Sequence, residues 1–333
     1  MHSRKSVLRQ HQEYGLSVPE IVDKHSEWVS EDKYMILNKV EMKTFATRDN
    51  RNNKLLRFSL QNKSEIFAIK CSKRGNDVYR ARVYRRFRGF ASLAKKTVFF
   101  NPKDRTVNKK TKALFVTLTY DTKLCSFSDS WDNSGVEFNR FMSRVRKNFG
   151  KVSCCRVFEA YKNGHVHIHA ILLFEEKQFE VFRDKKGQFR IKEKSILESG
   201  WHSYIDVKAM SSLGRGLAYL KKYLLKSIDA KNKDSKALKT LALGWLFNKR
   251  AFSVSGKFRQ MLIDLNKTKH NSNHKTQQIS LKGEIIQEYT YYCLGFVPAD
   301  VIRLKKDLWF SKLDNEQIKL VDKFIESKKR AWD

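Results

Sequence analysis

The sequence lacks the segments that mark secreted and membrane-spanning proteins. Its start, Met1 to Gln10, is polar and basic and has no apolar core of a signal peptide. The longest apolar runs, such as 170–174 and 241–247, are far too short to cross a bilayer. The 5 cysteines follow no CxxC spacing, which argues against a zinc ribbon and a disulfide framework. We therefore expect a reduced, cytoplasmic protein.

Acidic residues are scarce relative to basic ones. The chain has 35 Asp and Glu against 68 Lys and Arg, which gives a net charge of +33. An excess of this size favours a polyanionic partner. No amphipathic helix with a basic flank and no lipidation motif favours an anionic membrane, so we expect nucleic acid and no membrane partner.

Three histidines alternate along an apolar run that follows a short polar turn. His165, His167 and His169 occupy every second position, which places them on one face of a strand. The turn 162–164 has the form of a three-residue hairpin loop, with glycine at the position that needs a positive φ. The preceding run, 152–161, is then the partner strand of a hairpin.

This hairpin predicts a metal site. With the loop centred on Asn163, Glu159 lies opposite His167 at about 5 Å between Cβ atoms. Two imidazoles and one carboxylate then face one point, and this donor set suits a divalent ion such as Mn or Mg. The simpler alternatives are a histidine-lined surface strand and a metal-free polar core. The residues alone leave open whether His165 or His169 joins His167.

A second chemical element lies on a predicted helix from about 213 to 227, which Ser211 or Ser212 can cap. Tyr219 and Tyr223 are four residues apart and share a helix face. Each begins the pattern Tyr-x-x-Lys. A phenol is a weak nucleophile unless its target is polarised by a metal and flanked by cations. The alternative is a packed tyrosine beside solvated lysines, which here are Lys222 and Lys226.

The rest of the chain predicts an alternation of strands and helices. Residues 1–55 read as irregular or weakly helical, with a short helix near Ser17. In 56–100, arginine is interleaved with Tyr and Phe, as on surfaces that bind phosphates and stack bases, or on a helix with solvated arginines. We further expect strands at 112–120, near Phe189, at 201–207 and at 281–297, helices at 131–149 and 237–250, a turn at 252–256, and helices after Pro298.

The motifs together resemble those of the HUH endonucleases, in particular the two-tyrosine rolling-circle replication initiators of plasmids and single-stranded DNA viruses. The segment Val116–Tyr120 looks like motif one. The pair His167 and His169 looks like motif two, with Glu159 where the family keeps its third ligand. The segment Tyr219–Tyr223 looks like motif three. The motifs follow the order of the family within residues 113–226.

The resemblance implies an α+β fold. Its nuclease core is ferredoxin-like or RRM-like, with a central antiparallel sheet flanked by helices, and here it would carry basic extensions at both ends. We expect a basic N-terminal region with possible DNA contacts at 1–110, the endonuclease core at 111–260, and a mainly helical extension at 261–333.

The resemblance also implies an activity: metal-dependent, site-specific nicking and rejoining of single-stranded origin DNA. Mn or Mg would be held by Glu159, His167 and His169. Tyr219 would attack first and form a 5′-phosphotyrosine link that leaves a free 3′-OH primer, and Tyr223 would complete the closing transfer. The lysines 222 and 226 would neutralise phosphate or help accept the phenolic proton.

Two further expectations follow from the resemblance. The chain contains no GxxxxGK[ST] segment, so a host helicase would unwind the DNA and a host polymerase would extend the primer. The alternatives are a transposase or mobilisation relaxase with the same site, and a non-catalytic DNA-binding replication-control protein on the same fold.

Overall fold

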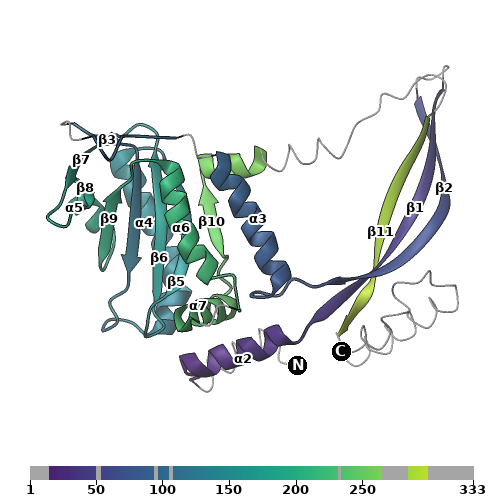
Figure 1. Cartoon of the computed structure of the whole chain (residues 1–333), viewed down its shortest axis with the longest axis horizontal. Helices are drawn as coiled ribbons and strands as arrows, with labels where there is room; N and C mark the ends of the chain where they lie inside the picture. Colours follow the sequence, from purple (N-terminus) through teal and green to yellow (C-terminus); the bar gives the residue numbers. More distant parts are fainter. Residues whose placement is uncertain are drawn as a thin grey trace. The chain divides into compact units, whose positions relative to one another are not determined.

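The computed structural model describes residues 15–49, 54–93, 97–104, 108–231, 234–264 and 284–298. These belong to two compact units (Figure 1). Unit 1 combines the chain up to Val29 with residues 73–271, and unit 2 combines residues 30–72 with residues 272–333. The helices predicted after Pro298 lie outside the described residues.

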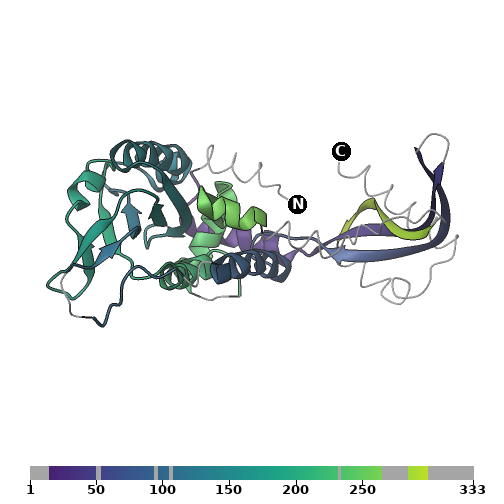
Figure 2. The ribbon, with the colours of Figure 1, turned by 90° about the horizontal axis from the view of Figure 1, so that it is seen from above.

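Unit 1 is built on a five-stranded sheet in which all neighbours run antiparallel, in the order β10-β5-β6-β4-β9. Helix α4 covers one face of this sheet, and α6 and α3 lie on the other (Figure 2). This confirms the predicted α+β fold and is consistent with an RRM-like core. The strands are β4 (Ala113–Thr119), β5 (Val152–Ala160), β6 (Val166–Phe174), β9 (Ile205–Ala209) and β10 (Phe252–Ser255).

The hairpin β5–β6 has the predicted register, with Glu159 opposite His167. Its loop depends on Gly164, which has φ 91° and whose added Cβ would lie 2.7 Å from Val18 Cγ2. A side chain at this position is therefore excluded both by backbone strain and by lack of space. The indole Nε1 of Trp131 donates to the carbonyl of Gly164 at 2.8 Å and ties the loop to helix α4.

Alternation along the strands builds a separate core on each face of the sheet. Helix α4 (Phe127–Phe149) begins with a capping box between Ser126 and Asp129, four residues before the predicted start. It buries Trp131 and Phe141 against the even-numbered positions of β6. On the other face, α6 (Leu213–Lys226) is capped by Ser212 and packs its leucines against the odd-numbered positions of β6.

Two helices and strand β10 extend the α6 face. Helix α3 (Asp77–Leu93) contains the arginine-rich segment, and α7 (Ser235–Leu246) lies at the end of β5. The predicted turn at 252–256 is wrong, because Phe252 to Ser255 pair with β5 as an edge strand. The turn residue is Gly256, at φ 59°.

A smaller sheet joins β3 (Lys110–Thr111), β7 (Phe179–Arg183) and β8 (Phe189–Ile191), in agreement with the strand predicted near Phe189. The short helix α5 (Lys194–Glu198) follows it. The strand predicted at 201–207 begins only at Ile205.

Helix α2 (Val18–Ser30) agrees with the helix predicted near Ser17, whose N–H and Oγ donate to Glu20 Oε2 at 2.7 Å. In unit 2, the antiparallel order is β11-β1-β2, with β1 (Lys33–Asp49), β2 (Lys54–Lys70) and β11 (Glu284–Pro298). The prediction that residues 1–55 are irregular or weakly helical is therefore wrong for β1. Strand β11 agrees with the strands predicted at 281–297.

Candidate active site

The candidate site lies on the α6 face of the sheet, where β4, β5 and β6 run side by side. His167 and His169 of β6 stand opposite Thr119 and Thr117 of β4. The Nδ1 atom of His169 is 3.2 Å from Thr117 Oγ1, and Nδ1 of His167 is 3.4 Å from Thr119 Oγ1. Each hydroxyl engages one ring nitrogen and leaves Nε2 to face the remaining groups of the site.

Glu159 connects the histidines to helix α6. Its Oε2 lies 3.0 Å from Nε2 of His169, and its Oε1 accepts a hydrogen bond from Lys226 Nζ at 2.8 Å. Burial alone would raise the pKa of the Glu159 carboxyl, but the hydrogen bonds and charges of His169 and Lys226 outweigh burial and lower the pKa to about 2. The carboxylate is therefore ionised at neutral pH.

Both imidazoles are neutral at physiological pH. Burial lowers the pKa of His167 to about 4, and it also lowers the pKa of His169 against the opposing effect of Glu159. A neutral imidazole with its Nδ1 engaged by a hydroxyl has the form in which histidine binds a metal through Nε2.

His165 does not belong to this set. It precedes β6, is 8% exposed, and its Nε2 donates to the carbonyl oxygen of Cys125 at 2.9 Å. The expectation of a DNA-facing His165 is therefore wrong, because the ring is turned into the protein beside the start of α4.

The two tyrosines of α6 lie against the histidine strand. The ring of Tyr223 stacks on the imidazole of His169, with centroids 3.6 Å apart and planes at 22°. The Tyr223 hydroxyl donates to the Tyr219 hydroxyl at 2.9 Å. Tyr219 itself is 41% exposed. Burial, and then the hydrogen bond to Tyr219, raise the pKa of Tyr223 above its usual value.

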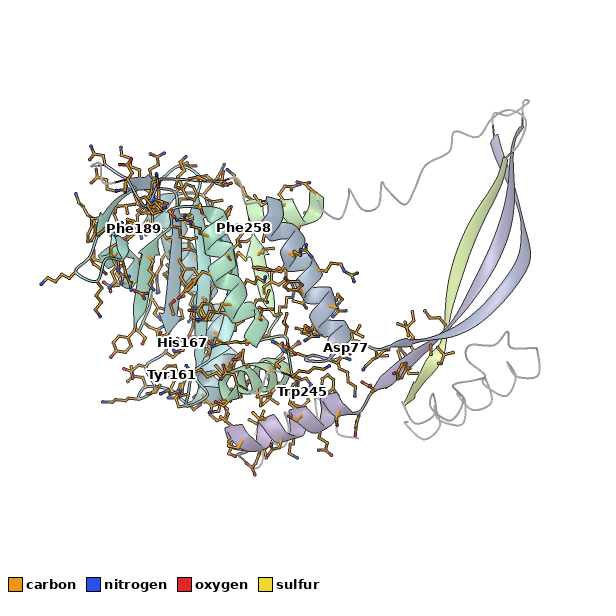
Figure 3. All side chains as sticks on the ribbon, in the orientation of Figure 1. Asp77, Tyr161, His167, Phe189, Trp245 and Phe258 are labelled. Atoms are coloured by element: carbon orange, nitrogen blue, oxygen red, sulfur yellow. The ribbon has the colours of Figure 1, made fainter. Side chains whose placement is uncertain are left out.

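Two more side chains border the phenols and imidazoles. The Nζ atom of Lys208 on β9 lies 5.9 Å above the ring of Tyr219. The ring of Tyr161 stacks on His167 at 4.8 Å, and the two residues lie at the same end of the sheet (Figure 3). Tyr161 is 44% exposed, so an aromatic surface at the mouth of the site is open to solvent.

The residues present fit a divalent cation in chemistry more than in arrangement. Within the described ranges, no group of three or more His, Cys, Asp or Glu side chains is arranged to hold a metal ion. The structure brings Glu159 and His169 into contact, whereas the ring centroid of His167 is 6.3 Å from that of His169. The donors nevertheless have the required form: two neutral imidazoles with Nδ1 engaged and one ionised carboxylate.

Residues 113–228 match a family model that describes a replication-associated protein of the ORF2 type. The match supports a replication initiator family. The matched segment runs from the start of β4 to just beyond α6, so it contains every group of the candidate site described above. No curated protein and no solved structure matches the chain. A replication protein of this kind binds DNA, in agreement with the net charge of +33.

Sequence patterns missed three members of this environment. The hydroxyls of Thr117 and Thr119 were visible in motif one, and their alternation with apolar residues was the signal that they face the histidines. Tyr161 adjoins the predicted loop, but no spacing rule predicts its stacking on His167.

Among the helices that the structure describes, none is both long and apolar enough to cross a membrane. This agrees with the short apolar runs of the sequence.

Proposed function

We propose that this protein initiates rolling-circle replication by nicking single-stranded origin DNA through Tyr219. The observation that supports this most is the placement of a hydrogen-bonded tyrosine pair directly on the histidine strand. Tyr223 stacks on His169 while its hydroxyl reaches Tyr219. A merely structural tyrosine pair has no need of an ionised carboxylate and a lysine beside it, yet Glu159 and Lys226 are both present.

In the proposed step, Tyr219 Oη attacks the scissile phosphorus. A bond forms between this oxygen and phosphorus, the bond from phosphorus to the 3′ oxygen breaks, and the phenolic proton ends on the released 3′ hydroxyl. The DNA is then attached to Tyr219 through its 5′ phosphate. The hydrogen bond from Tyr223 to Tyr219 stabilises the developing phenolate, because donation to a charged oxygen is stronger than donation to a neutral one.

A bound Mn or Mg would polarise the scissile phosphate and offset its developing negative charge. Glu159, His167 and His169 are the residues that would hold it. Thr117 and Thr119 orient the two imidazoles, and Lys226 adds a fixed positive charge.

Strand closure would use the second phenol. Once Tyr219 carries DNA, Tyr223 is the nearest remaining hydroxyl on the same helix face, 2.9 Å away in the free protein. Attack by Tyr223 on a second phosphodiester would release a new 3′ hydroxyl. That hydroxyl would displace Tyr219 and join the strand into a circle. Host helicase and polymerase would supply unwinding and synthesis.

The test uses purified protein, Mn or Mg, and single-stranded oligonucleotides tiled across the replicon that encodes it. We expect one oligonucleotide to be cut and to form a covalent adduct that mass spectrometry maps to Tyr219. A double Tyr219→Phe and Tyr223→Phe variant should form none.

Two results would count against this proposal. An adduct that persists in the double variant would remove both phenols from the mechanism. Salt-sensitive binding without metal and without cleavage would favour a non-catalytic replication-control protein. A transposase or relaxase would be indicated by cleavage at insertion ends or at a transfer origin instead.

A further inference from the structure

A second strongly basic feature of unit 1 lies away from the tyrosines, in a groove between α3, the end of α7 and β10. The groove has a volume of about 960 Å³. Six of its lining residues are Arg or Lys and none is Asp or Glu. The cations of the lining are Arg74, Arg82, Arg85, Arg86, Lys249 and Arg250.

Helix α3 supplies the exposed cations of this wall. Arg82, Arg85 and Arg86 are all exposed. The guanidinium of Arg82 lies 5.8 Å from the centre of the Tyr79 ring, and that of Arg86 lies 5.6 Å from the centre of the Phe252 ring. Aromatic neighbours hold these charges at the groove while the guanidinium donors remain available to an anion.

The opposite wall is rigid and aromatic. Trp28 and Trp245 lie with ring centroids 5.4 Å apart, and both line the groove. Trp245 is 4% exposed, and its indole Nε1 finds no hydrogen-bond acceptor among the described residues. A buried donor without an acceptor costs stability unless a ligand or water satisfies it. In Figure 3, Trp245 lies close to Asp77, where α3 begins.

The groove is distinct from the candidate active site. Its lining contains no residue of the histidine strand β6 and none of helix α6. The sheet order places β10 at the edge, separated from β6 by β5. A ligand in the groove would therefore contact a different surface from the one that contains Tyr219.

We propose that this groove binds single-stranded DNA next to the nicking site. The proposal rests on the proposed function, because the strand would be a continuation of the one that is cut. A lining with six cations and no carboxylate matches a phosphate chain in charge. Aromatic and guanidinium planes between the cations match exposed bases, which a duplex keeps stacked inside.

The groove gives the arginine-rich segment a specific use. In a replication initiator, the strand next to the cut must be held while the 3′ end is extended. A second contact on the same chain raises the effective concentration of that strand at the tyrosines. The expected effect of losing the groove is weaker binding of long strands with unchanged chemistry on short ones.

The experiment replaces the three exposed arginines of α3 together, as Arg82→Gln, Arg85→Gln and Arg86→Gln, in the full chain. Fluorescence anisotropy with a labelled 30-nucleotide strand should show affinity reduced about tenfold or more, and a salt slope that is smaller by about 2, since each lost phosphate contact in a single strand contributes about 0.7. Adduct formation on a short oligonucleotide that spans only the nick site, at saturating concentration, should stay unchanged.

A matched control removes the same charge from the other side of the sheet. Arg140→Gln, Arg146→Gln and Lys147→Gln lie on the exposed surface of α4. This control should change the affinity less than threefold, so that a general loss of charge is distinguished from a loss of the groove. Equal weakening by both triple variants, or unchanged affinity and slope in the α3 variant, would overturn the groove proposal. Failure of adduct formation in the wild-type protein would instead overturn the nicking proposal and leave the binding result intact.

Discussion

The imidazole of His169 lies flat against the phenol ring of Tyr223, at 3.6 Å between centroids. One histidine is therefore in contact with both a carboxylate and a tyrosine, because Nε2 of the same ring lies 3.0 Å from Glu159 Oε2. The stacking limits the movement of Tyr223, while Tyr219 remains 41% exposed. The two phenols thus have unequal environments although they share one helix face.

This inequality predicts unequal roles for the tyrosines. The Tyr219→Phe variant should lose the first adduct, because its hydroxyl is the exposed one and accepts a hydrogen bond from Tyr223. The Tyr223→Phe variant should still form the adduct about ten- to a hundredfold more slowly, since a hydrogen bond to a charged oxygen contributes about 1.5–3 kcal/mol. Single-turnover kinetics with mass mapping measure both. An adduct on Tyr223 in the wild-type protein would reverse this assignment.

The threonines of β4 should act through the histidines. Thr117→Val removes the hydroxyl that lies 3.2 Å from Nδ1 of His169 and keeps the shape of the side chain. Metal affinity should fall about 10- to 100-fold, as is usual when an outer partner of a ligating histidine is lost. The readout is the shift in melting temperature as Mn is titrated, which does not depend on turnover.

Thr117→Ser is the matched control for that variant, because it keeps the hydroxyl. It should retain most of the Mn-dependent shift. If the Val and Ser variants lose the shift equally, packing rather than the hydroxyl is responsible, and the positioning role is contradicted.

Lys226 and Lys222 should differ, although both match the Tyr-x-x-Lys pattern. Lys226 donates to Glu159 at 2.8 Å and is half-buried, whereas Lys222 is exposed. Lys226→Gln should slow adduct formation about tenfold or more, because it removes a charge-assisted contact beside the reacting phosphate. The same change should tighten Mn binding, since the ammonium and a metal compete for Glu159. Lys222→Gln should alter both quantities less than threefold, and equal effects from the two would show that only total charge matters.

The part of the fold closest to the motifs was predictable from sequence. The hairpin register that sets Glu159 opposite His167 follows from alternation and from the glycine at position 164. The helix that contains Tyr219 follows from its leucine spacing and its serine cap. These features depend on neighbours close in sequence, which is why local rules reached them.

The features that failed depend on partners far along the chain. Strand β1 pairs with β11, which lies near the other end of the sequence, and its polar sequence has no clean alternation. Strand β10 was taken for a turn because its four residues contain two serines, and only pairing with β5 makes it a strand. The contact of Lys226 with Glu159 likewise needs α6 to be docked on the sheet.

A last prediction concerns His25, a buried residue in unit 1 away from the tyrosines. His25 is 2% exposed, its Nε2 donates to the carbonyl of Arg74 at 3.1 Å, and its ring packs on Trp28 and Trp245. Burial, and then the charge of Arg74, lower the pKa of His25 from 6.5 to about 3. The neutral ring is therefore the form that the folded protein accommodates.

The sign of the effect follows from proton linkage. Below about pH 6.5 the unfolded chain binds a proton at His25 that the folded protein does not, so the stabilising contribution is complete above pH 6.5 and is lost as pH falls toward 3. Between pH 6.5 and pH 4 the loss should be on the order of 3 kcal/mol. Urea melts of the wild type and of His25→Gln, which keeps a donor but does not titrate, measure it. The variant should lose less stability over this interval, and parallel curves for the two proteins would show that His25 is not the group responsible.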